Sequence, residues 1–378
     1  MAQAADWDPR GNAALEDQLS VYDEMRGRCP VAHSDYLGWS VFSHSDVVEV
    51  VTDHETFSNE VSAHLSVPNG MDPPEHTKFR EIVDRYYTAD LMERFEPDCR
   101  RITRTLVGAL SGRVQFMDEV ARPFALQMQS AFLGWPQELH EPLAEWTVKN
   151  HRATLRRDRE AMAEIALEFD GYIRQMLDAR RDSDPGSDLT ARLLPEQVDG
   201  RPLTDTEIVS ILRNWTVGEL STIAASTGIM AHYLAEHPEL QDRLRARPQD
   251  LPAAIDEMLR IHPPLIANRR VATRDVELGG RQIPAGDRLT VIWASANRDE
   301  QVFGDPDEFR LDRDPADNLL YGAGIHVCPG APLARLEMRV FLEELLAATT
   351  AIELVPGEAP VRAAYPASGF TTLPLLLR

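Results

Sequence analysis

Cysteine is scarce in this chain, and what the sequence lacks excludes several classes of protein. Its three cysteines, Cys29, Cys99 and Cys328, are odd in number, far apart and never in C-x-x-C spacing. A disulfide framework or a structural zinc site is therefore not expected, and a reducing cytoplasm fits. The start of the chain has no basic segment before an apolar core, and no stretch approaches eighteen purely apolar residues. Neither a signal peptide nor a membrane span is predicted.

Positive charge is also in short supply. The chain has 39 Lys and Arg against 61 Asp and Glu, a net charge of −22. This balance argues against non-specific binding to nucleic acid or to an acidic membrane. Two interpretations of the charge stay open, an acidic exterior with a local basic patch for an acidic partner, or solubility alone. Hydrophobic residues make up 43% of the 378 residues, which is enough for a large core.

The spacing of apolar residues predicts a mainly helical fold. Residues 90–262 carry apolar side chains three and four apart. Turn-forming residues predict loops at 182–188 and 195–202. The capping box at 204–207 predicts a long helix that ends at His237, before a proline. This helix has one charge between residues 214 and 231, so we expect it to be central and packed on most sides.

The pattern changes after a second helix, predicted from about 252 to 262. A hairpin at 276–286 is followed by a predicted strand at 288–293. Further strands are expected at 39–42 and 373–377. The sequence thus predicts one mainly α domain with small β-sheets fed from both ends of the chain.

The most informative segment is Tyr321–Gly330, a glycine-rich loop that contains Cys328 and precedes a helix-forming stretch at 331–339. Small residues allow a flat cofactor to lie close to the backbone, and the free N–H groups of a helix start favour a thiolate. This arrangement would present one sulfur ligand to a haem iron. A lone cysteine is more often a buried structural residue, so other residues must decide between the two interpretations.

Those residues resemble the cytochrome P450 family, the haem-thiolate monooxygenases, over nearly the whole chain. The loop matches the signature aromatic-Gly-x-Gly-x-His-x-Cys-x-Gly, with Tyr321 in place of the usual Phe. The resemblance implies the cytochrome P450 fold, with the long central helix over the haem. It also implies that Cys328 is the ligand of the iron of haem b and that Gly322 and Gly324 allow the porphyrin to approach. Gly330 and its neighbours would donate hydrogen bonds to the sulfur.

A second motif lies on the helix predicted before residue 263. Glu257 and Arg260 are three apart and share a helix face, so they can form an ion pair. Such pairs are common on surfaces, but this one matches the E-x-x-R motif of the family, which implies a buried pair that braces the cysteine loop. Its third partner is Arg310 or Arg313, a choice that the sequence leaves open.

Haem carries two carboxylates that need cations or hydrogen-bond donors when buried. The family pattern assigns this part to His76 and Arg80, four apart on one predicted helix, and to Arg270 and His326. Each of these residues alone fits an ordinary solvated surface position. As a group that shares one ligand, they support the resemblance.

The helix that activates oxygen departs from the family pattern. The family usually has Ala/Gly-Gly-x-Asp/Glu-Thr, whereas residues 218–222 read Gly-Glu-Leu-Ser-Thr. One register makes Thr222 the alcohol and puts Ser221 in place of the acid, and a register shifted by one residue makes Ser221 the alcohol. Glu219 either replaces the missing acid from a new direction or makes a structural polar contact. The departure leaves room for a reaction driven by peroxide.

The resemblance places the substrate over the face of the haem opposite the cysteine. Its walls would come from the loop at 63–67, the central helix, the segment at 265–268 and the turn at 368–370, which are mostly apolar. The pocket residues predicted on these segments are Leu65, Val217, Leu220, Ile266 and Phe370.

The sequence therefore predicts a cytoplasmic monooxygenase with one haem-binding domain at 1–378 and no fused reductase, membrane contact or nucleic-acid partner. It would insert one oxygen atom from O2 into a small, largely apolar organic substrate, by hydroxylation or O-dealkylation. Electrons would come from a separate ferredoxin or flavin-type donor, with Arg335 and Arg339 near the docking face. Two alternatives are a peroxygenase or non-redox catalyst on the same fold, and a haem-thiolate sensor without catalysis.

Overall fold

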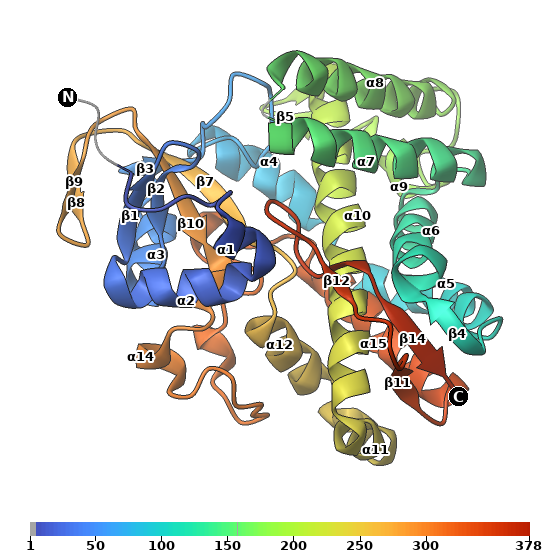
Figure 1. Ribbon diagram of the computed structural model, residues 1–378. Coiled ribbons are helices and arrows are strands. Elements are labelled where there is room, and N and C mark those ends of the chain that lie inside the picture. Colours follow the sequence, from blue (N-terminus) through green and yellow to red (C-terminus); the bar gives the residue numbers. More distant parts are fainter. Residues whose placement is uncertain (1–4, 157) are drawn as a thin grey trace.

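The computed structural model describes residues 5–156 and 158–378 and shows a helical region built around one long helix, beside a smaller region that holds most of the sheet (Figure 1). The N-terminal segment belongs to the sheet region, and the chain ends in the helical region. The first four residues, on which the signal-peptide prediction partly rests, lie outside the described residues. In the described part of the chain, no helix has the length and apolar character needed to span a membrane.

The helices confirm the mainly α fold. The α-helices are α1 (Asn12–Glu16), α2 (Gln18–Arg28), α3 (His44–Thr52), α4 (Glu75–Asp84), α5 (Ala89–Val107), α6 (Arg122–Leu133), α7 (His140–Arg156), α8 (Arg159–Asp178), α9 (Leu189–Leu193), α10 (Asp205–Glu236), α11 (Pro238–Ala246), α12 (Leu251–Ile261), α13 (Trp293–Ala296), α14 (Glu300–Phe303) and α15 (Ala331–Ala348). Short π or 3-10 helices are η1 (Met117–Ala121), η2 (Gln137–Leu139), η3 (Pro248–Asp250), η4 (Pro315–Asp317) and η5 (Gly324–His326).

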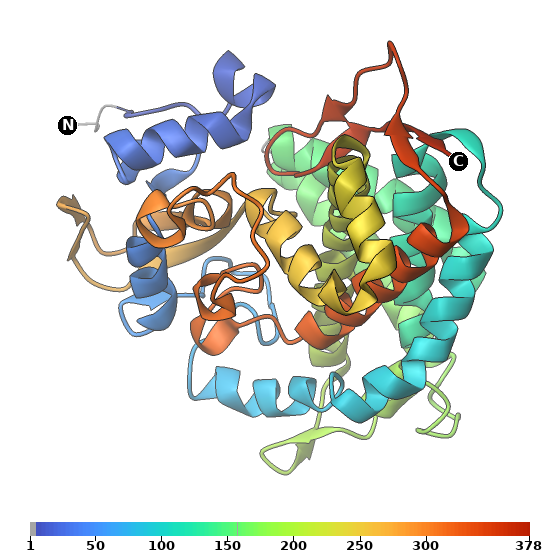
Figure 2. The same cartoon turned by 90° about the horizontal axis from the view of Figure 1, so that it is seen from below.

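The long helix α10 begins and ends where the sequence predicts. Thr204 is its N-cap, and the reciprocal hydrogen bonds of the capping box are both formed with Glu207. His237 is its C-cap, directly before the proline that starts α11. The helix runs through the middle of the helical region, with α6, α8, α12 and α15 packed against it (Figures 1 and 2). Burial on most sides is therefore confirmed.

One stretch in the middle of α10 departs from this burial. Val217 and Gly218 are exposed, and Glu219, Ser221 and Thr222 are half-buried, although the helix is largely buried on either side of them. This is the stretch that departs from the family pattern. Apart from Leu220, the residues of this stretch are therefore accessible to solvent rather than buried in the core.

In residues 5–156 and 158–378, the strands form two larger sheets and three two-stranded hairpins. The five-stranded sheet has the order β1 (Val31–Ser34), β2 (Gly38–Val41), β10 (Arg288–Ile292), β7 (Ala267–Ala272) and β3 (Phe57–Ser58), and the three-stranded sheet the order β11 (Ile352–Leu354), β14 (Pro374–Leu377) and β4 (Gly112–Gln115). The hairpins pair β5 (Gln197–Val198) with β6 (Arg201–Pro202), β8 (Val276–Leu278) with β9 (Arg281–Ile283), and β12 (Val361–Arg362) with β13 (Phe370–Thr372). Strands β2 and β14 bring both ends of the chain into the sheets, as predicted.

Two segments differ from the sequence prediction. The loop expected at 195–202 is the hairpin of β5 and β6, because Asp199 and Gly200 both take positive φ values, 51° and 73°, which suit a two-residue hairpin turn. The segment at 265–268, expected only as a pocket wall, leads into β7, which pairs with β10. The polar and basic residues of β7 do not show the alternation of apolar and polar side chains that predicts a strand.

Candidate functional site

The loop before α15 is shaped by two glycines and held by neighbouring elements. Gly322 and Gly324 have φ values of 73° and 70°, which favour glycine. A Cβ at Gly324 would overlap the carbonyl oxygen of Val51 at the end of α3, so this glycine serves the packing of the loop on α3. The predicted approach of a cofactor to this glycine stays a prediction. A Cβ at Gly322 would meet nothing closer than 3.9 Å.

The thiol of Cys328 is accessible and carries main-chain donors. Its own N–H donates to the carbonyl of Tyr321 at 2.8 Å, which closes the loop. The N–H groups of Gly330 and Ala331 point at the sulfur, as the sequence predicts. Burial raises the pKa of the thiol, and Glu219 adds to the rise, whereas the two N–H groups lower it. Solvent still reaches the side chain, because protein surrounds the sulfur on some sides only. A single, accessible sulfur with fixed donors suits an iron ligand.

The predicted ion pair is present and fully buried. Nε and Nη2 of Arg260 donate to Glu257 at 2.8 and 2.9 Å, and Arg260 has 0% exposure. The structure settles the third partner as Arg313, whose Nε donates to Glu257 at 2.8 Å. The side chain of Arg310 pairs with Asp312 instead, although its main-chain N–H also reaches Glu257.

A residue missed by sequence reasoning carries this network to the cysteine loop. The main-chain oxygen of Asn297 accepts from Arg260 at 2.8 Å, and its side-chain oxygen accepts from the N–H of Leu319 at 2.7 Å. Leu319 stands at the start of the loop. The buried pair on α12 is therefore linked to the loop by a chain of hydrogen bonds. An isolated asparagine outside any motif gives no signal in the sequence.

Three of the four predicted donors to the haem carboxylates meet in one buried cluster. His76 and Arg270 are 3% and 5% exposed, and the rings of His76 and His326 lie 4.3 Å apart. Nε2 of each histidine is buried and finds no hydrogen-bond partner among the described residues. Nη1 of Arg270 donates to the main-chain oxygen of Arg269 at 2.8 Å. Such a cluster fits the two carboxylates of a haem, because buried donors need acceptors.

The pKa values of two residues in this cluster are lowered. Burial, together with the neighbouring His76, Arg270 and Arg80, lowers the pKa of His326 to about 3. Burial also lowers the pKa of Arg270 to about 10. An anionic ligand would relieve both effects.

Arg80, the fourth predicted donor, is occupied by the cysteine loop. Its Nη1 donates to the carbonyls of Ile325 and Val327 at 3.1 and 2.7 Å, and its Nε donates to Asp84 at 2.6 Å. Arg80 therefore holds the cysteine loop from α4, and its role at a haem carboxylate stays a prediction. Carbonyls on a loop are accessible acceptors that a sequence pattern does not reveal.

On α10, the side chains of Glu219, Leu220 and Thr222 have different surroundings. Oγ1 of Thr222 donates to the carbonyl of Gly218 at 2.6 Å, one turn earlier. Leu220 is 6% exposed and belongs to the main hydrophobic core, so it does not line a pocket as predicted. The side chain of Glu219 reaches the buried Glu337 on α15. No motif predicted from the sequence includes Glu337.

Several apolar side chains of the predicted pocket segments are exposed. Leu65, Val217 and Leu265 are 38%, 38% and 39% exposed, unlike the buried majority of large apolar residues. Ile266, predicted as a pocket residue, is buried in the core beside β2 and β10 instead, with 1% exposure. In an extended segment neighbouring side chains point to opposite sides, so Leu265 is the member that faces out.

Hydrogen bonds attach the loop that carries Leu65 to α10. The hydroxyl of Ser210 bridges the carbonyl of Leu65 and the N–H of Val67, at 3.0 and 2.8 Å. Nη2 of Arg213 donates to the same carbonyl of Leu65 at 2.6 Å. Residues 210, 213 and 217 share one face of the helix, so Leu65 and Val217 belong to one wall.

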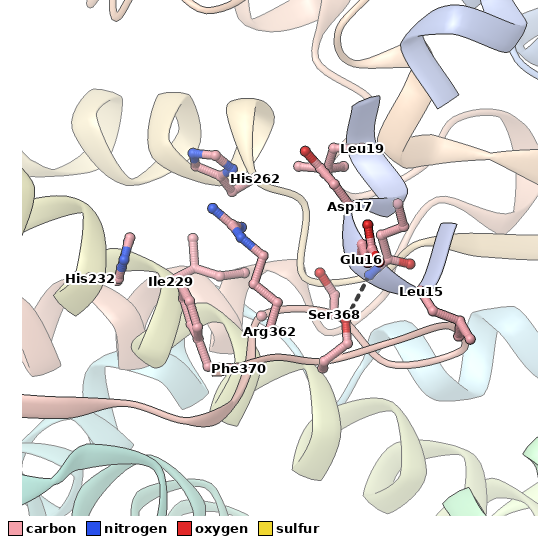
Figure 3. A pocket seen from close by; sticks show the side chains of 13 residues that line it. Leu15, Glu16, Asp17, Leu19, Ile229, His232, His262, Arg362, Ser368 and Phe370 are labelled. Atoms are coloured by element: carbon pink, nitrogen blue, oxygen red, sulfur yellow. Dashed lines mark hydrogen bonds between the residues drawn. The ribbon is translucent and has the colours of Figure 1, made fainter. Parts of the chain in front are cut away.

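Phe370, the last predicted pocket residue, faces a different hollow. Its ring lies 4.6 Å from that of His232 and beneath Arg362, in the small pocket of Figure 3. This pocket holds about 30 Å³, room for about one water molecule and too little for an organic substrate. Gly369 sits on Ala225, so the turn itself contacts α10 one turn beyond the exposed stretch. Phe370 is therefore turned away from the predicted wall.

Comparisons with known proteins agree with this geometry. A sequence profile described as Cytochrome P450 matches residues 250–366. The chain is 34% identical to the erythromycin C-12 hydroxylase of Saccharopolyspora erythraea over 350 residues, 88% of each chain. It is 30% identical to the linalool 8-monooxygenase of Pseudomonas putida over 371 residues, 88% of this chain and 89% of the relative.

Solved structures give the same result. A mutant of P450 EryK in complex with erythromycin B has a TM-score of 0.88 and 31% identity, with coverage of 95% of this chain and 96% of that chain. CYP109E1 from Bacillus megaterium in complex with testosterone has a TM-score of 0.87 and 27% identity, with coverage of 98% and 100%. Since identity above 30% extends over most of the sequence and the Cys328 loop has its brace and its donor cluster, the chain belongs to the cytochrome P450 family of haem-dependent monooxygenases.

Proposed function

We propose that this enzyme inserts one oxygen atom from O2 into a small, largely apolar organic substrate, with electrons from a separate donor. The accessible thiol of Cys328, fixed by two N–H donors, is the observation that carries the proposal. Haem b, bound through this sulfur, supplies oxygen activation, because thiolate ligation favours cleavage of the O–O bond. The chain itself contributes binding, orientation and protons.

The cofactor would be held from two sides. Cys328 would bind the iron, while His76, Arg270 and His326 would donate to the carboxylates of the haem. The unpartnered Nε2 atoms of both histidines support this assignment. Arg80 and the network of Glu257 would keep the cysteine loop in place.

The substrate would lie against Leu65, Val217 and Leu265, whose apolar side chains are exposed within the fold. Such a wall favours an apolar organic molecule. The names of the relatives, a hydroxylase for erythromycin and a monooxygenase for linalool, support an organic substrate. Thr222 and Ser221, beside this wall on α10, would position O2 and the water that forms from it.

The electron donor would be a ferredoxin or a flavoprotein in the cytoplasm that docks on one haem-binding domain. Arg335 supports a docking surface near the cysteine loop, since its side chain is half exposed, stacks on Tyr321 at 4.3 Å and pairs, among the described residues, with one carboxylate only, that of Asp256. Arg339 supports it less, because its guanidinium is paired with Glu96 and Glu343.

A carbon monoxide difference spectrum of the reduced protein tests the central assignment. The native protein should give the Soret band of thiolate ligation, and Cys328→Ala should lose it. A band typical of histidine ligation in the native protein would overturn the proposal. Product formation with a reductase, ferredoxin and O2, compared with product formation with peroxide alone, then decides between the monooxygenase and the peroxygenase.

A further inference from the structure

Two arginines lie side by side on one face of the five-stranded sheet. Arg269 on β7 is paired with Thr290 of β10, and Arg288 on β10 is paired with Val271 of β7. Paired residues of antiparallel strands share a face of the sheet, as do residues two apart on one strand, so both arginines project from the same face. As diagonal neighbours, their Cβ atoms are about 7–8 Å apart. Two positive charges this close repel each other unless an anion lies between them.

The described residues provide no carboxylate for these two side chains. Both arginines are exposed, and neither forms an ion pair with a described residue. Nη2 of Arg288 donates to the main-chain oxygen of Val61 at 3.2 Å. The neighbouring Asp287 accepts from Nε1 of Trp39 at 3.0 Å instead. Donors therefore remain on both guanidinium groups for an anion from outside the chain, although the chain has 61 acidic residues.

The face that carries the two arginines continues into the predicted substrate wall. Leu265 precedes Arg269 by four residues in an extended segment, so their side chains point to the same side. At about 3.3 Å per residue, the two residues are up to about 13 Å apart. Arg288 reaches the loop that carries Leu65, because its acceptor Val61 lies four residues before Leu65. These two segments therefore carry apolar side chains at one end and positive charge at the other.

The end of α7 adds positive charge over the same edge of the sheet. The hydroxyl of Tyr36, in the turn between β1 and β2, donates to the carbonyl of Thr154 in α7 at 3.3 Å. Strand β2, which follows this turn, pairs with the strand of Arg288. Arg156 and Arg159 follow Thr154, are exposed, and form no ion pair with any residue that the structure describes. The end of α7 and the start of α8 lie next to the sheet region (Figure 1).

We propose that Arg269 and Arg288 bind a carboxylate and that the substrate of this enzyme is an organic acid. The inference rests on the monooxygenase function proposed above and narrows its substrate class. The apolar body of the acid lies along Leu65 and Leu265. Its carboxylate lies between the two guanidinium groups, each of which can bind both carboxylate oxygens through parallel hydrogen bonds. Positive charge at the end of α7 draws the acid to this edge of the sheet, although the chain as a whole is acidic.

Haem ligands that differ only in one terminal group test this subsite. Each probe has an imidazole that binds the iron and a straight alkyl chain that ends either in a carboxylate or in a primary amide. Chains of about six to about twelve carbon atoms bracket the length of the wall. Titration of the holoenzyme, followed by the shift of the Soret band, gives the dissociation constant of each probe. The long acids should bind at least about 5-fold more tightly than their amides, whereas the short acids should show no preference.

Glutamine variants assign the preference to the two arginines. Arg269→Gln and Arg288→Gln should each weaken binding of the long acids by about 5-fold and leave binding of the amides at the native value. Arg174→Gln is the matched control, because Arg174 on α8 is also exposed and forms no ion pair with a described residue. Arg174 lies about 22 Å along α8 from Arg159, so this variant should keep the native preference. The carbon monoxide spectrum of each variant verifies that the haem is bound.

Equal affinity for acids and amides at every chain length would overturn the subsite, as would failure of every acid to bind. A preference that both arginine variants retain, or that does not depend on chain length, would have the same consequence, because it would indicate attraction by the protein surface at large. These titrations need no turnover. Failure of the native enzyme to oxygenate any substrate would therefore count against the proposed function, and the titrations would still decide the binding of acids.

Discussion

The buried network of Glu257 allows a quantitative prediction. Oε1 of Glu257 accepts from Nη2 of Arg260, Nε of Arg313 and the N–H of Arg310, and its Oε2 accepts from Nε of Arg260. In Glu257→Gln the amide oxygen can replace Oε1, but the NH2 group then faces the Nε–H of Arg260, donor against donor. Two buried guanidinium groups also lose their counter-charge.

Removing one partner of a buried ion pair costs about 3–5 kcal/mol. Because three of the four hydrogen bonds can be kept, we expect the lower end, about 3 kcal/mol of the free energy of unfolding. With an m value of about 3 kcal/mol/M, the midpoint of urea unfolding should fall by about 1 M. Circular dichroism follows the unfolding, and the Soret band follows release of haem, which should begin at lower urea because the network extends to the cysteine loop.

Asp312→Asn is the matched control. Asp312 is 75% exposed and pairs with Arg310 at 3.0 Å in the same segment, so its loss should cost less than about 0.5 kcal/mol. Equal, small shifts of the midpoint in both variants would refute the reasoning that Glu257 braces the fold.

Three further predictions concern other parts of the structure. Burial lowers the pKa of His262 from its ordinary value of 6.5 to about 3. Between these two pH values the unfolded chain binds a proton that the folded chain does not bind. The free energy of unfolding should therefore fall as the pH drops from 6.5 towards 3. His262→Gln should flatten this fall in urea titrations at pH 7 and pH 5, and an unchanged slope would contradict it. Gly324→Ala should destabilise the fold by more than about 2 kcal/mol, through its positive φ and overlap with Val51, whereas Gly322→Ala, with the same strain but free space, should cost about 1 kcal/mol in thermal melts. Equal losses of stability in the two glycine variants would contradict this prediction. Arg213→Met should weaken substrate binding, measured by spectral titration, without changing the carbon monoxide spectrum, because it removes one of the hydrogen bonds that hold the loop at 65–67 on α10. A native dissociation constant would contradict this.

Local chemistry with a fixed pattern could be predicted from the sequence. The capping box at Thr204 and the loop around Cys328 both appeared where expected, because their residues act on their own neighbours in the chain. The pairing of Glu257 and Arg260 also follows from helix geometry. Such features need no knowledge of distant contacts.

Features that depend on the direction of a side chain could not be predicted. Leu220 and Ile266 lie in segments predicted to form the pocket, yet both are buried in the core. Phe370 turns towards His232, and Glu337 gains meaning only from its contact with Glu219. These relations arise from packing between elements far apart in the sequence, which no local pattern records.

The attachment of the loop at 65–67 to α10 bears on how this enzyme can be redesigned. Ser210 and Arg213 join the loop to the turns of helix just before Val217, so a redesign of the loop length would also shift the exposed stretch of α10. Side-chain substitutions of Leu65 and Val217 do not remove these hydrogen bonds, because Ser210 and Arg213 bind the main chain of the loop. A library that varies these two positions and keeps Ser210 and Arg213 should change substrate specificity. The positions of Ser221 and Thr222 on α10 should be preserved.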